Sequence, residues 1–326
     1  MTKVMPLAKR GISNSRLALG CMPFGGGWDT EPFTEQHVKE AEAAVEAALS
    51  IGITMFDHAD IYTRGKAEQV FGRVLQARPD LREQIVIQSK CGIQLGEGDL
   101  PGRFNFSKEH ILDSVDGNLE RLGIDYLDVL LLHRPDPLVE PEEVAEAFAR
   151  LKSSGKVRYF GVSNMSASQI KFLQQAIPDS FAVNQLEMSL NHLHFVDHVV
   201  HVNQQAGTAV NFAEGLMEYC RTEDIQLQAW SPLAQGKFSG RDIKDEPEHI
   251  QKTAQLVQQM AADKETTAEA IVLGWLMYHP AMIQPIIGTS NPERIKACAD
   301  AERQASLMTR DEWYTLYVSA RGTLLP

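Results

Sequence analysis

Short apolar runs alternate with longer amphipathic segments along most of the chain. The runs have the length and character of strands that are buried on both faces, as in a parallel sheet. Eight of them occur, at Leu17–Leu19, Ile53–Phe56, Ile85–Ile87, Val129–Leu132, Tyr159–Val162, Ala182–Val183, Ile225–Ala229 and Ile283–Ile287. Because segments of helical spacing lie between them, the pattern predicts strand–helix units repeated without a break.

The segments between the runs carry the signals of helix beginnings and ends. Ser107–Leu122 begins at a capping residue and is followed by Gly123, a residue that commonly ends helices. Pro141–Ser154 opens with proline and acidic residues, which suit the first turn of a helix. Helices of the same kind are predicted at Glu35–Ser50, Glu68–Gln76, Ser166–Ala176, Gly215–Arg221, Thr266–Tyr278 and Pro292–Ala301.

Eight strand–helix units in 326 residues fit a closed (β/α)8 TIM barrel better than an open sheet. No repeat or low-complexity linker divides the chain, so we expect a single α/β domain over residues 1–326. For the N-terminal extension before Leu17 we predict a short hairpin that closes the bottom of the barrel. Long loops are expected at the C-terminal face, at His192–Gly207 and Gly236–Glu248, where lids and binding loops are common.

The composition and charge indicate a soluble protein and argue against several classes of partner. Hydrophobic residues make up 44% and charged residues 23%, which is typical of a soluble globular protein. The net charge of −12 argues against nucleic acid or an anionic membrane as a partner. No run of about 18 apolar residues exists to span a membrane, and the N-terminus does not have the pattern of a signal peptide. The four scattered cysteines form no CxxC pair, so we expect reduced thiols in a cytoplasmic protein.

Unusual polar and aromatic residues follow nearly every predicted strand. They are Asp57 to Tyr62, Lys90, His133 and Arg134, Ser163 and Asn164, Asn184 and Gln185, Trp230 to Pro232, and Gly288 to Ser290. Each alone has an ordinary structural interpretation, such as a capping carboxylate or a packed aromatic ring. Because the carboxyl ends of barrel strands meet at one mouth, the whole set predicts an active site there.

Five motifs follow one another between residues 56 and 236. They are Phe56-Asp57-x-Ala59-Asp60-x-Tyr62, Leu122-Gly123-x-Asp125-Tyr126-x-Asp128 with Leu131-Leu132-His133, Gly155-Lys156-Val157-Arg158-x-Phe160-Gly161-Val162-Ser163-Asn164, Asn184-Gln185-x-Glu187, and Trp230-Ser231-Pro232-Leu233-x-x-Gly236. With these motifs the chain resembles the aldo-keto reductase superfamily over residues 10–300, and five ordered motifs are far more specific than a lone glycine-rich loop. The resemblance implies a reductase that moves hydride from NADPH to an aldehyde or ketone carbonyl.

The resemblance implies a catalytic tetrad of Asp57, Tyr62, Lys90 and His133, and all four positions carry the expected residue. Hydride addition leaves an alkoxide that needs a proton, and a tyrosine with a pKa of about 10 is protonated at neutral pH. The ammonium of Lys90 would stabilise the phenolate of Tyr62. Asp57 would hold Lys90 in place, and His133 would orient the substrate oxygen or relay a proton.

The resemblance also assigns residues to the cofactor NADPH. Trp230 would stack on the nicotinamide, while Ser163, Asn164 and Gln185 would bind its carboxamide. Cofactor phosphates in barrels belong near the last strand and its loops. The remaining cofactor candidates are therefore Ser231, Leu233, Gly236, Lys237, Gly288, Thr289, Ser290 and Arg294. Among these, Ser290 and Arg294 are candidates for the 2′-phosphate, since a planar guanidinium suits phosphate and a predicted helix begins there.

Phe24 and Trp28 flank three glycines in the loop after the first strand, and we expect both to line the substrate pocket. Four positions depart from the pattern of the superfamily: His58, Met188, Gly288 and Cys298. Cys298 stands where members often have an asparagine that contacts adenine, which leaves the recognition of adenine open.

Three alternatives to this interpretation differ in the role of the barrel mouth or of a histidine-rich segment. A reductase-like regulatory subunit would bind the cofactor but act through a protein partner. A barrel lyase would use Lys90 as a Schiff-base nucleophile. His192, His194, His198 and His201 are close in sequence, but no cysteine or acidic set completes a metal-binding spacing, so we expect a polar loop and no metal. The sequence leaves the carbonyl substrate, the preference for NADPH over NADH and the oligomeric state open.

Overall fold

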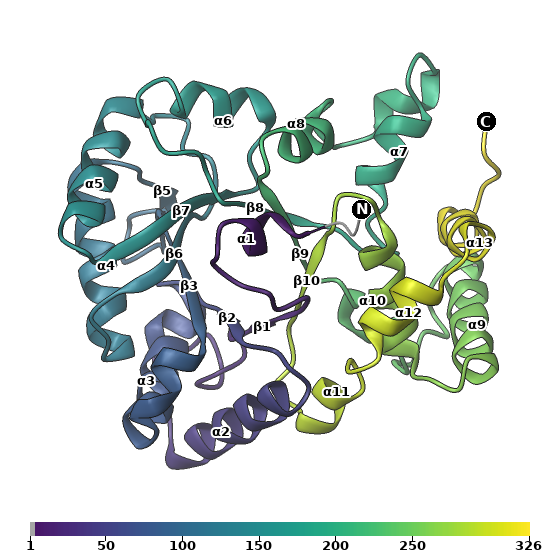
Figure 1. The fold of residues 1–326 in the computed structure, drawn as a ribbon, viewed down its shortest axis with the longest axis horizontal. Helices are drawn as coiled ribbons and strands as arrows, with labels where there is room; N and C mark the ends of the chain where they lie inside the picture. Colours follow the sequence, from purple (N-terminus) through teal and green to yellow (C-terminus); the bar gives the residue numbers. More distant parts are fainter. Residues whose placement is uncertain (1–3) are drawn as a thin grey trace.

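The strands close into a parallel barrel (Figure 1). The computed structural model describes residues 4–326, and the strand order around the barrel is β1, β10, β9, β8, β7, β6, β3, β2 and back to β1. The strands are β1 (Ala18–Gly20), β2 (Met55–Asp57), β3 (Val86–Cys91), β6 (Leu127–Leu132), β7 (Val157–Ser163), β8 (Val183–Glu187), β9 (Gln226–Trp230) and β10 (Gln284–Ile287). Each predicted run overlaps one of them, so the predicted (β/α)8 fold is confirmed. A small antiparallel pair, β4 (Ile93–Gln94) and β5 (Arg103–Phe104), lies outside the barrel sheet.

The predicted helices surround the barrel. They are α2 (Glu35–Ser50), α3 (Lys66–Ala77), α4 (Lys108–Leu122), α5 (Pro141–Ser153), α6 (Ala167–Leu173), α8 (Leu216–Thr222), α10 (Ala268–Tyr278) and α11 (Pro292–Lys296). The predicted cap of α4 is present, because the Ser107 side chain accepts a hydrogen bond from the amide of His110. The predicted ends of α6 and α11 were too late, since the chain leaves both helices in turns.

Four helices of the described chain were not predicted, besides the one at the N-terminus. They are α7 (His194–Val200), α9 (Glu248–Asp263), α12 (Ala301–Leu307) and α13 (Arg310–Arg321). α9 packs against α13 and α12 packs against α10, on the side of the barrel near the C-terminus (Figure 1). Trp275 of α10 and Trp313 of α13 stack with ring centroids 5.2 Å apart, and each indole N–H donates to the backbone carbonyl of the other at 3.1 Å.

The N-terminal extension covers the bottom of the barrel with a helix, so the predicted hairpin was wrong. α1 (Pro6–Lys9) begins at a proline, which suits the first position of a helix. Met5 and Leu7 are buried and pack with strand residues such as Met55 and Val129. In Figure 1, α1 lies over the centre of the ring of strands. The part of the prediction that falls on residues 1–3 lies outside the described residues.

The two predicted long loops have different outcomes. Residues 237–247 contain no helix or strand, which confirms the loop before α9. The loop predicted at His192–Gly207 was wrong in part, because it contains α7. Asp197 of α7 accepts a hydrogen bond from Tyr317 and pairs with Arg321 at 3.2 Å, which holds this helix on α13.

The cysteines and the helices can be compared with the predictions made from composition. All four cysteines are free and buried, as expected for reduced thiols. Within residues 4–326, none of the helices has both the length and the apolar character needed to cross a membrane.

Candidate active site

A cavity of about 530 Å³ opens where the strands end in their carboxyl termini. Its lining residues are Gly20, Met22, Asp57, Tyr62, His133, Arg134, Ser163, Asn164, Gln185, Trp230, Ser231, Pro232, Leu233, Ala234, Gln235, Gly236, Ile286, Gly288, Thr289 and Arg294. Lys90 is fully buried and hydrogen-bonded to Tyr62. The structure thus brings all four tetrad residues and most of the predicted cofactor residues to one mouth.

Lys90 connects three of the tetrad residues by hydrogen bonds. Its Nζ lies 2.8 Å from the hydroxyl oxygen of Tyr62, 2.8 and 2.7 Å from the two carboxylate oxygens of Asp57, and 2.8 Å from the carbonyl of His58. An ammonium has protons to donate and no lone pair to accept, so the Tyr62 oxygen is the acceptor of its bond with Lys90. The phenolic proton of Tyr62 is therefore free to form a hydrogen bond with another acceptor. Because Tyr62 lines the cavity, a molecule bound there can provide that acceptor.

The protonation states of Tyr62 and Lys90 follow from burial and from their mutual contact. Burial raises the pKa of Tyr62 above its ordinary value, and the charge of Lys90 opposes that rise without cancelling it. For Lys90, burial lowers the pKa, but the attraction of Asp57 and Tyr62 outweighs burial and leaves the pKa above its usual range. At neutral pH Tyr62 thus keeps its proton and Lys90 keeps its charge.

His133 follows β6 directly and places a neutral imidazole beside Tyr62. The two ring centroids are 5.9 Å apart in an edge-to-face arrangement. Burial, together with the charges of Lys90 and Arg134, holds the pKa of His133 well below its ordinary value. Its Nδ1 is buried and has no hydrogen-bond partner among residues 4–326. A neutral imidazole has one N–H donor and one acceptor nitrogen, so the tautomer with its proton on Nε2 can donate to a substrate oxygen.

A ladder of buried glutamine side chains supports Asp57 from inside the barrel. The side-chain amides of Gln88 and Gln185 donate to Asp57 Oδ1 at 2.6 and 3.0 Å. Both also donate to Gln228 Oε1, at 2.9 and 3.1 Å. Gln228 in turn donates to Gln284 at 2.9 Å, and Gln284 donates to the carbonyl of Ser15 at 2.6 Å. The carboxylate beneath the active site is therefore tied to the N-terminal segment at the barrel bottom.

Gln88→Leu is expected to lower the free energy of unfolding by about 2 kcal/mol, because a hydrogen bond to a buried charged group is lost. Urea unfolding followed by circular dichroism measures the change. Gln258→Leu is the matched control, since Gln258 is exposed on α9; it should change stability by less than about 0.5 kcal/mol. Equal stability of the two variants would show that the ladder contributes nothing.

The three residues predicted to bind the nicotinamide carboxamide lie together beside Trp230. Asn164 Nδ2 donates to Ser163 Oγ at 2.8 Å, and Ser163 Oγ donates to the carbonyl of Gln185 at 3.0 Å. Trp230 Nε1 donates to Asn164 Oδ1 at 3.2 Å. Asn164 and Ser231 both adopt left-handed backbone conformations, with φ of 57° and 52°. Such conformations outside glycine concentrate at functional sites, where surrounding contacts enforce them.

The predicted phosphate side of the mouth is formed by loops after β9 and β10. Ser231, Leu233, Gly236, Gly288, Thr289 and Arg294 all line the cavity. Gly236 has a φ of +83°, and a Cβ there would lie 2.7 Å from Nη2 of Arg294. The backbone at Gly236 and the guanidinium of Arg294 therefore lie in close contact, and we call this pair the phosphate cradle. Within the described chain, no carboxylate forms an ion pair with Arg294, so its charge is free for an anionic ligand.

Two predicted cofactor residues do not reach the cavity. Lys237 is bound elsewhere, since its ammonium pairs with Glu246 at 2.9 Å. Ser290 is half-buried and is absent from the lining of the cavity.

The two predicted substrate residues are likewise not among the lining residues. Phe24 is buried and stacks on Phe71, and Trp28 is exposed. Their carbonyls instead hold the segment after Tyr62: Thr63 Oγ1 donates to the Phe24 carbonyl and Arg64 Nε donates to the Trp28 carbonyl, each at 2.9 Å. The loop thus supports the position of Tyr62 without presenting these two rings to the mouth.

The cavity also contains residues to which the sequence analysis assigned no role. Arg134 and Pro232 were among the predicted strand-end residues, whereas Gly20, Met22, Ala234, Gln235 and Ile286 were not named. A signal for Arg134 was present, because it directly follows His133 at the end of a strand. Gly20 and Met22 carried the same signal at the end of β1.

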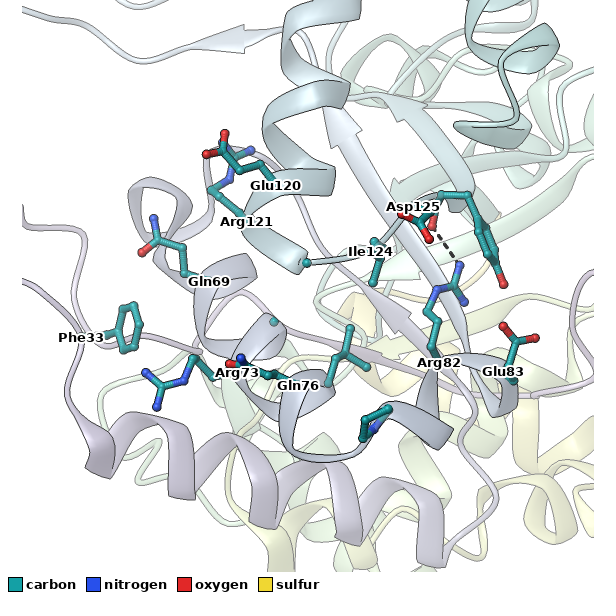
Figure 2. A pocket seen from close by; sticks show the side chains of 15 residues that line it. Phe33, Gln69, Arg73, Gln76, Arg82, Glu83, Glu120, Arg121, Ile124 and Asp125 are labelled. Carbon is teal, nitrogen blue, oxygen red and sulfur yellow. Dashed lines mark hydrogen bonds between the residues drawn. The ribbon is translucent and has the colours of Figure 1, made fainter.

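A larger cavity of about 960 Å³ lies outside the barrel, between α3 and α4 (Figure 2). Its arginines already have carboxylate partners: Arg73 pairs with Glu35, Arg82 with Asp128, and Arg121 with Glu68. None of the strand-end residues reaches it, so the mouth of the barrel is the better candidate for chemistry.

The histidine-rich segment forms no metal centre within the described part of the chain, where no group of three or more His, Cys, Asp or Glu residues could hold an ion. His192 and His194 stack with centroids 5.2 Å apart. His201 contacts the guanidinium of Arg321 through Nε2 at 2.6 Å. Through His201, the segment contacts α13, and this contact helps to hold the two parts of the chain together.

The fold and the mouth together define a (β/α)8-barrel enzyme, and comparison with known proteins narrows the class. The family model described as "Aldo/keto reductase family" matches residues 16–314. The chain is 38% identical to the uncharacterized oxidoreductase YcsN of Bacillus subtilis (strain 168), over 90% of this chain and 92% of that protein. It is 36% identical to a 6-dehydroglucose reductase of Agrobacterium fabrum, over 94% and 95% of the two chains.

A solved structure with a similar fold is an aldo-keto reductase from Klebsiella pneumoniae in complex with NADPH, with a TM-score of 0.69 and 23% identity, covering 92% of this chain and 89% of that one. The chain belongs to the aldo/keto reductase family and is an NAD(P)H-dependent oxidoreductase.

Proposed function

We propose that the protein reduces the carbonyl group of an aldehyde or ketone with NADPH, and that Tyr62 donates the proton. The observation that carries this proposal is the 2.8 Å contact between the Tyr62 hydroxyl and the buried ammonium of Lys90 at the wall of the cavity. The phenol is protonated at neutral pH, and an ammonium stands ready to stabilise the phenolate that forms when the proton leaves.

Each residue of the tetrad has a distinct part in this reaction. Tyr62 gives its proton to the carbonyl oxygen as negative charge develops there. Lys90 stabilises the resulting phenolate, and Asp57 offsets the cost of burying the ammonium. His133, neutral and beside Tyr62, donates to the same carbonyl oxygen and fixes its direction.

The residues at the mouth fit a nicotinamide dinucleotide phosphate. When bound, the reduced nicotinamide supplies the hydride. Both amide protons of Gln185 are engaged with Asp57 and Gln228, so its Oε1 is left to accept from a carboxamide. The cradle of Gly236 and Arg294 suits phosphate. The reduced, buried thiols are compatible with the cytoplasm, which we propose as the location.

The alternative of a Schiff-base lyase does not fit the state of Lys90. A nucleophilic amine must be deprotonated. The Lys90 amine donates to oxygen atoms of Asp57, His58 and Tyr62, and its pKa lies above the usual range. Lys90 is thus held as a cation.

The proposal is tested by following the absorbance of NADPH while the protein is mixed with a panel of simple aldehydes and ketones. We expect turnover of at least some members of the panel, and turnover at least about 10²-fold slower by Tyr62→Phe. A protein that binds NADPH but turns over no carbonyl would contradict the proposal and favour the regulatory subunit, for which a pull-down from a lysate is the complementary experiment.

Arg294→Gln is expected to raise KM for NADPH about tenfold or more and to leave KM for NADH within about twofold, because a charge-assisted contact to the 2′-phosphate is lost. Steady-state kinetics with both cofactors measure the two values. Arg310→Gln is the matched control, since Arg310 lies exposed on α13. An equal effect of Arg294→Gln on both cofactors would remove Arg294 from 2′-phosphate recognition.

A further inference from the structure

Arg134 is an exposed cation on the wall of the active-site cavity. It directly follows His133, which lies edge-on to Tyr62. Among residues 4–326, no hydrogen bond or ion pair to its guanidinium is found. The guanidinium lies over the ring of Trp230, 5.9 Å from its centroid, a weak interaction for a partly exposed pair. The carboxylate of Asp136, two residues further on, accepts hydrogen bonds from the backbone amides of Phe106 and Leu138.

The cavity holds a second unpaired arginine, and the barrel places the two on opposite sides. Arg294 follows β10 and Arg134 follows β6. In the strand order β10, β9, β8, β7, β6, these two strands are separated by half of the eight-stranded ring. The phosphate cradle occupies the β10 side. Arg134 follows β6 on the other side, near the ends of β2 and β3, and its guanidinium extends toward the ring of Trp230 on β9.

The charges of the cavity leave Arg134 without a compensating group. Asp57 is the only carboxylate among the described residues that line the cavity, and Lys90 already neutralises it. The protein as a whole carries a net charge of −12, which repels anions at long range. In this acidic protein, a free guanidinium lies on the wall of the same cavity as Tyr62 and His133. Its planar fork of donors matches the geometry of carboxylate and of other oxyanions.

We propose that Arg134 binds an anionic oxyacid group of the substrate, so that the preferred substrates are aldehydes or ketones that also carry such a group, a carboxylate above all. This inference rests on the proposed carbonyl reduction. The carbonyl oxygen is held by Tyr62 and His133, while the oxyacid group reaches Arg134 on the same side of the mouth.

The test uses two probes that share the benzaldehyde ring and carry a charged or a neutral group at the para position, 4-carboxybenzaldehyde and its methyl ester. We expect the wild-type protein to have a kcat/KM for the acid at least about tenfold above that for the ester, the size of one charge-assisted hydrogen bond. Arg134→Gln should bring this ratio near one, chiefly through KM for the acid. Arg134→Lys should keep part of the preference, because a point charge remains but the bidentate fork is lost.

Arg150→Gln is the control for net charge. Arg150 is exposed on α5, outside the lining of the cavity, and its loss should leave the acid-to-ester ratio unchanged. A wild-type ratio near one overturns the proposal. So does an Arg134→Gln variant that binds NADPH more weakly while keeping the ratio, because Arg134 would then serve the cofactor.

Failure of the proposed function is distinguishable from failure of this inference. If neither aldehyde is reduced, calorimetric binding of 4-(hydroxymethyl)benzoate and its methyl ester to the protein with NADPH decides the role of Arg134. Tighter binding of the acid, lost in Arg134→Gln, supports the oxyanion site; equal binding overturns it.

Discussion

Tyr62→Phe is expected to lower kcat for carbonyl reduction by about 10²–10⁴-fold, the usual contribution of a positioned general acid. The variant keeps the ring, the edge-to-face contact with His133 and the shape of the cavity, and it loses only the hydroxyl group that Lys90 contacts at 2.8 Å. Its dissociation constant for NADPH, measured by fluorescence titration, should stay within about twofold. Steady-state kinetics with the best carbonyl of the panel supply kcat.

Tyr159→Phe is the matched control, because Tyr159 lies on β7 with its hydroxyl at the carbonyl of Arg10, in the N-terminal segment at the barrel bottom. Its kcat should equal that of the wild type. The role assigned to Tyr62 is wrong if Tyr62→Phe weakens NADPH binding while the bound complex turns over at the normal rate.

The barrel was predictable because its strands are apolar on both faces and its helices carry end signals. The meeting of Asp57, Tyr62, Lys90 and His133 at one mouth was predictable for a related reason, since each stands at or soon after the end of a strand. The catalytic roles of the four residues came from the resemblance to the family. The helix α13 also had local signals. Thr309 and Glu312 form a capping box at the start of α13, and Gly322 ends it. This helix was missed because a (β/α)8 barrel is complete without it.

Other features could not be predicted from the sequence, because they depend on the closure of the barrel or on backbone contacts. The glutamines of the ladder stand on β3, β8, β9 and β10, and only the closed barrel brings their side chains together. Phe24 and Trp28 act through backbone carbonyls, which no residue type reveals. The fold of α1 was missed because Pro6 was not used as a helix-start signal, and a hairpin was assumed.

Lys90→Met is expected to lower turnover by about 10²–10³-fold and also to destabilise the fold. Removing the ammonium leaves the phenolate of Tyr62 without stabilisation, which typically costs about 10²–10³-fold in rate. It also leaves the buried carboxylate of Asp57 with the amides of Gln88 and Gln185 as its remaining side-chain partners among residues 4–326. Breaking a buried ion pair from one side costs about 3–5 kcal/mol. Urea unfolding and steady-state kinetics measure the two losses.

The double variant Asp57→Asn/Lys90→Met separates the two effects of Lys90. A neutral amide at position 57 removes the uncompensated charge, so we expect stability to recover by more than about half while turnover stays lost. Lys108→Met, which breaks an exposed pair with Glu146, should change stability by less than about 1 kcal/mol and leave kcat unchanged. Recovery of turnover in the double variant would mean that the ammonium only offsets Asp57 and does not act on Tyr62, and the mechanism proposed for the tetrad would then be wrong.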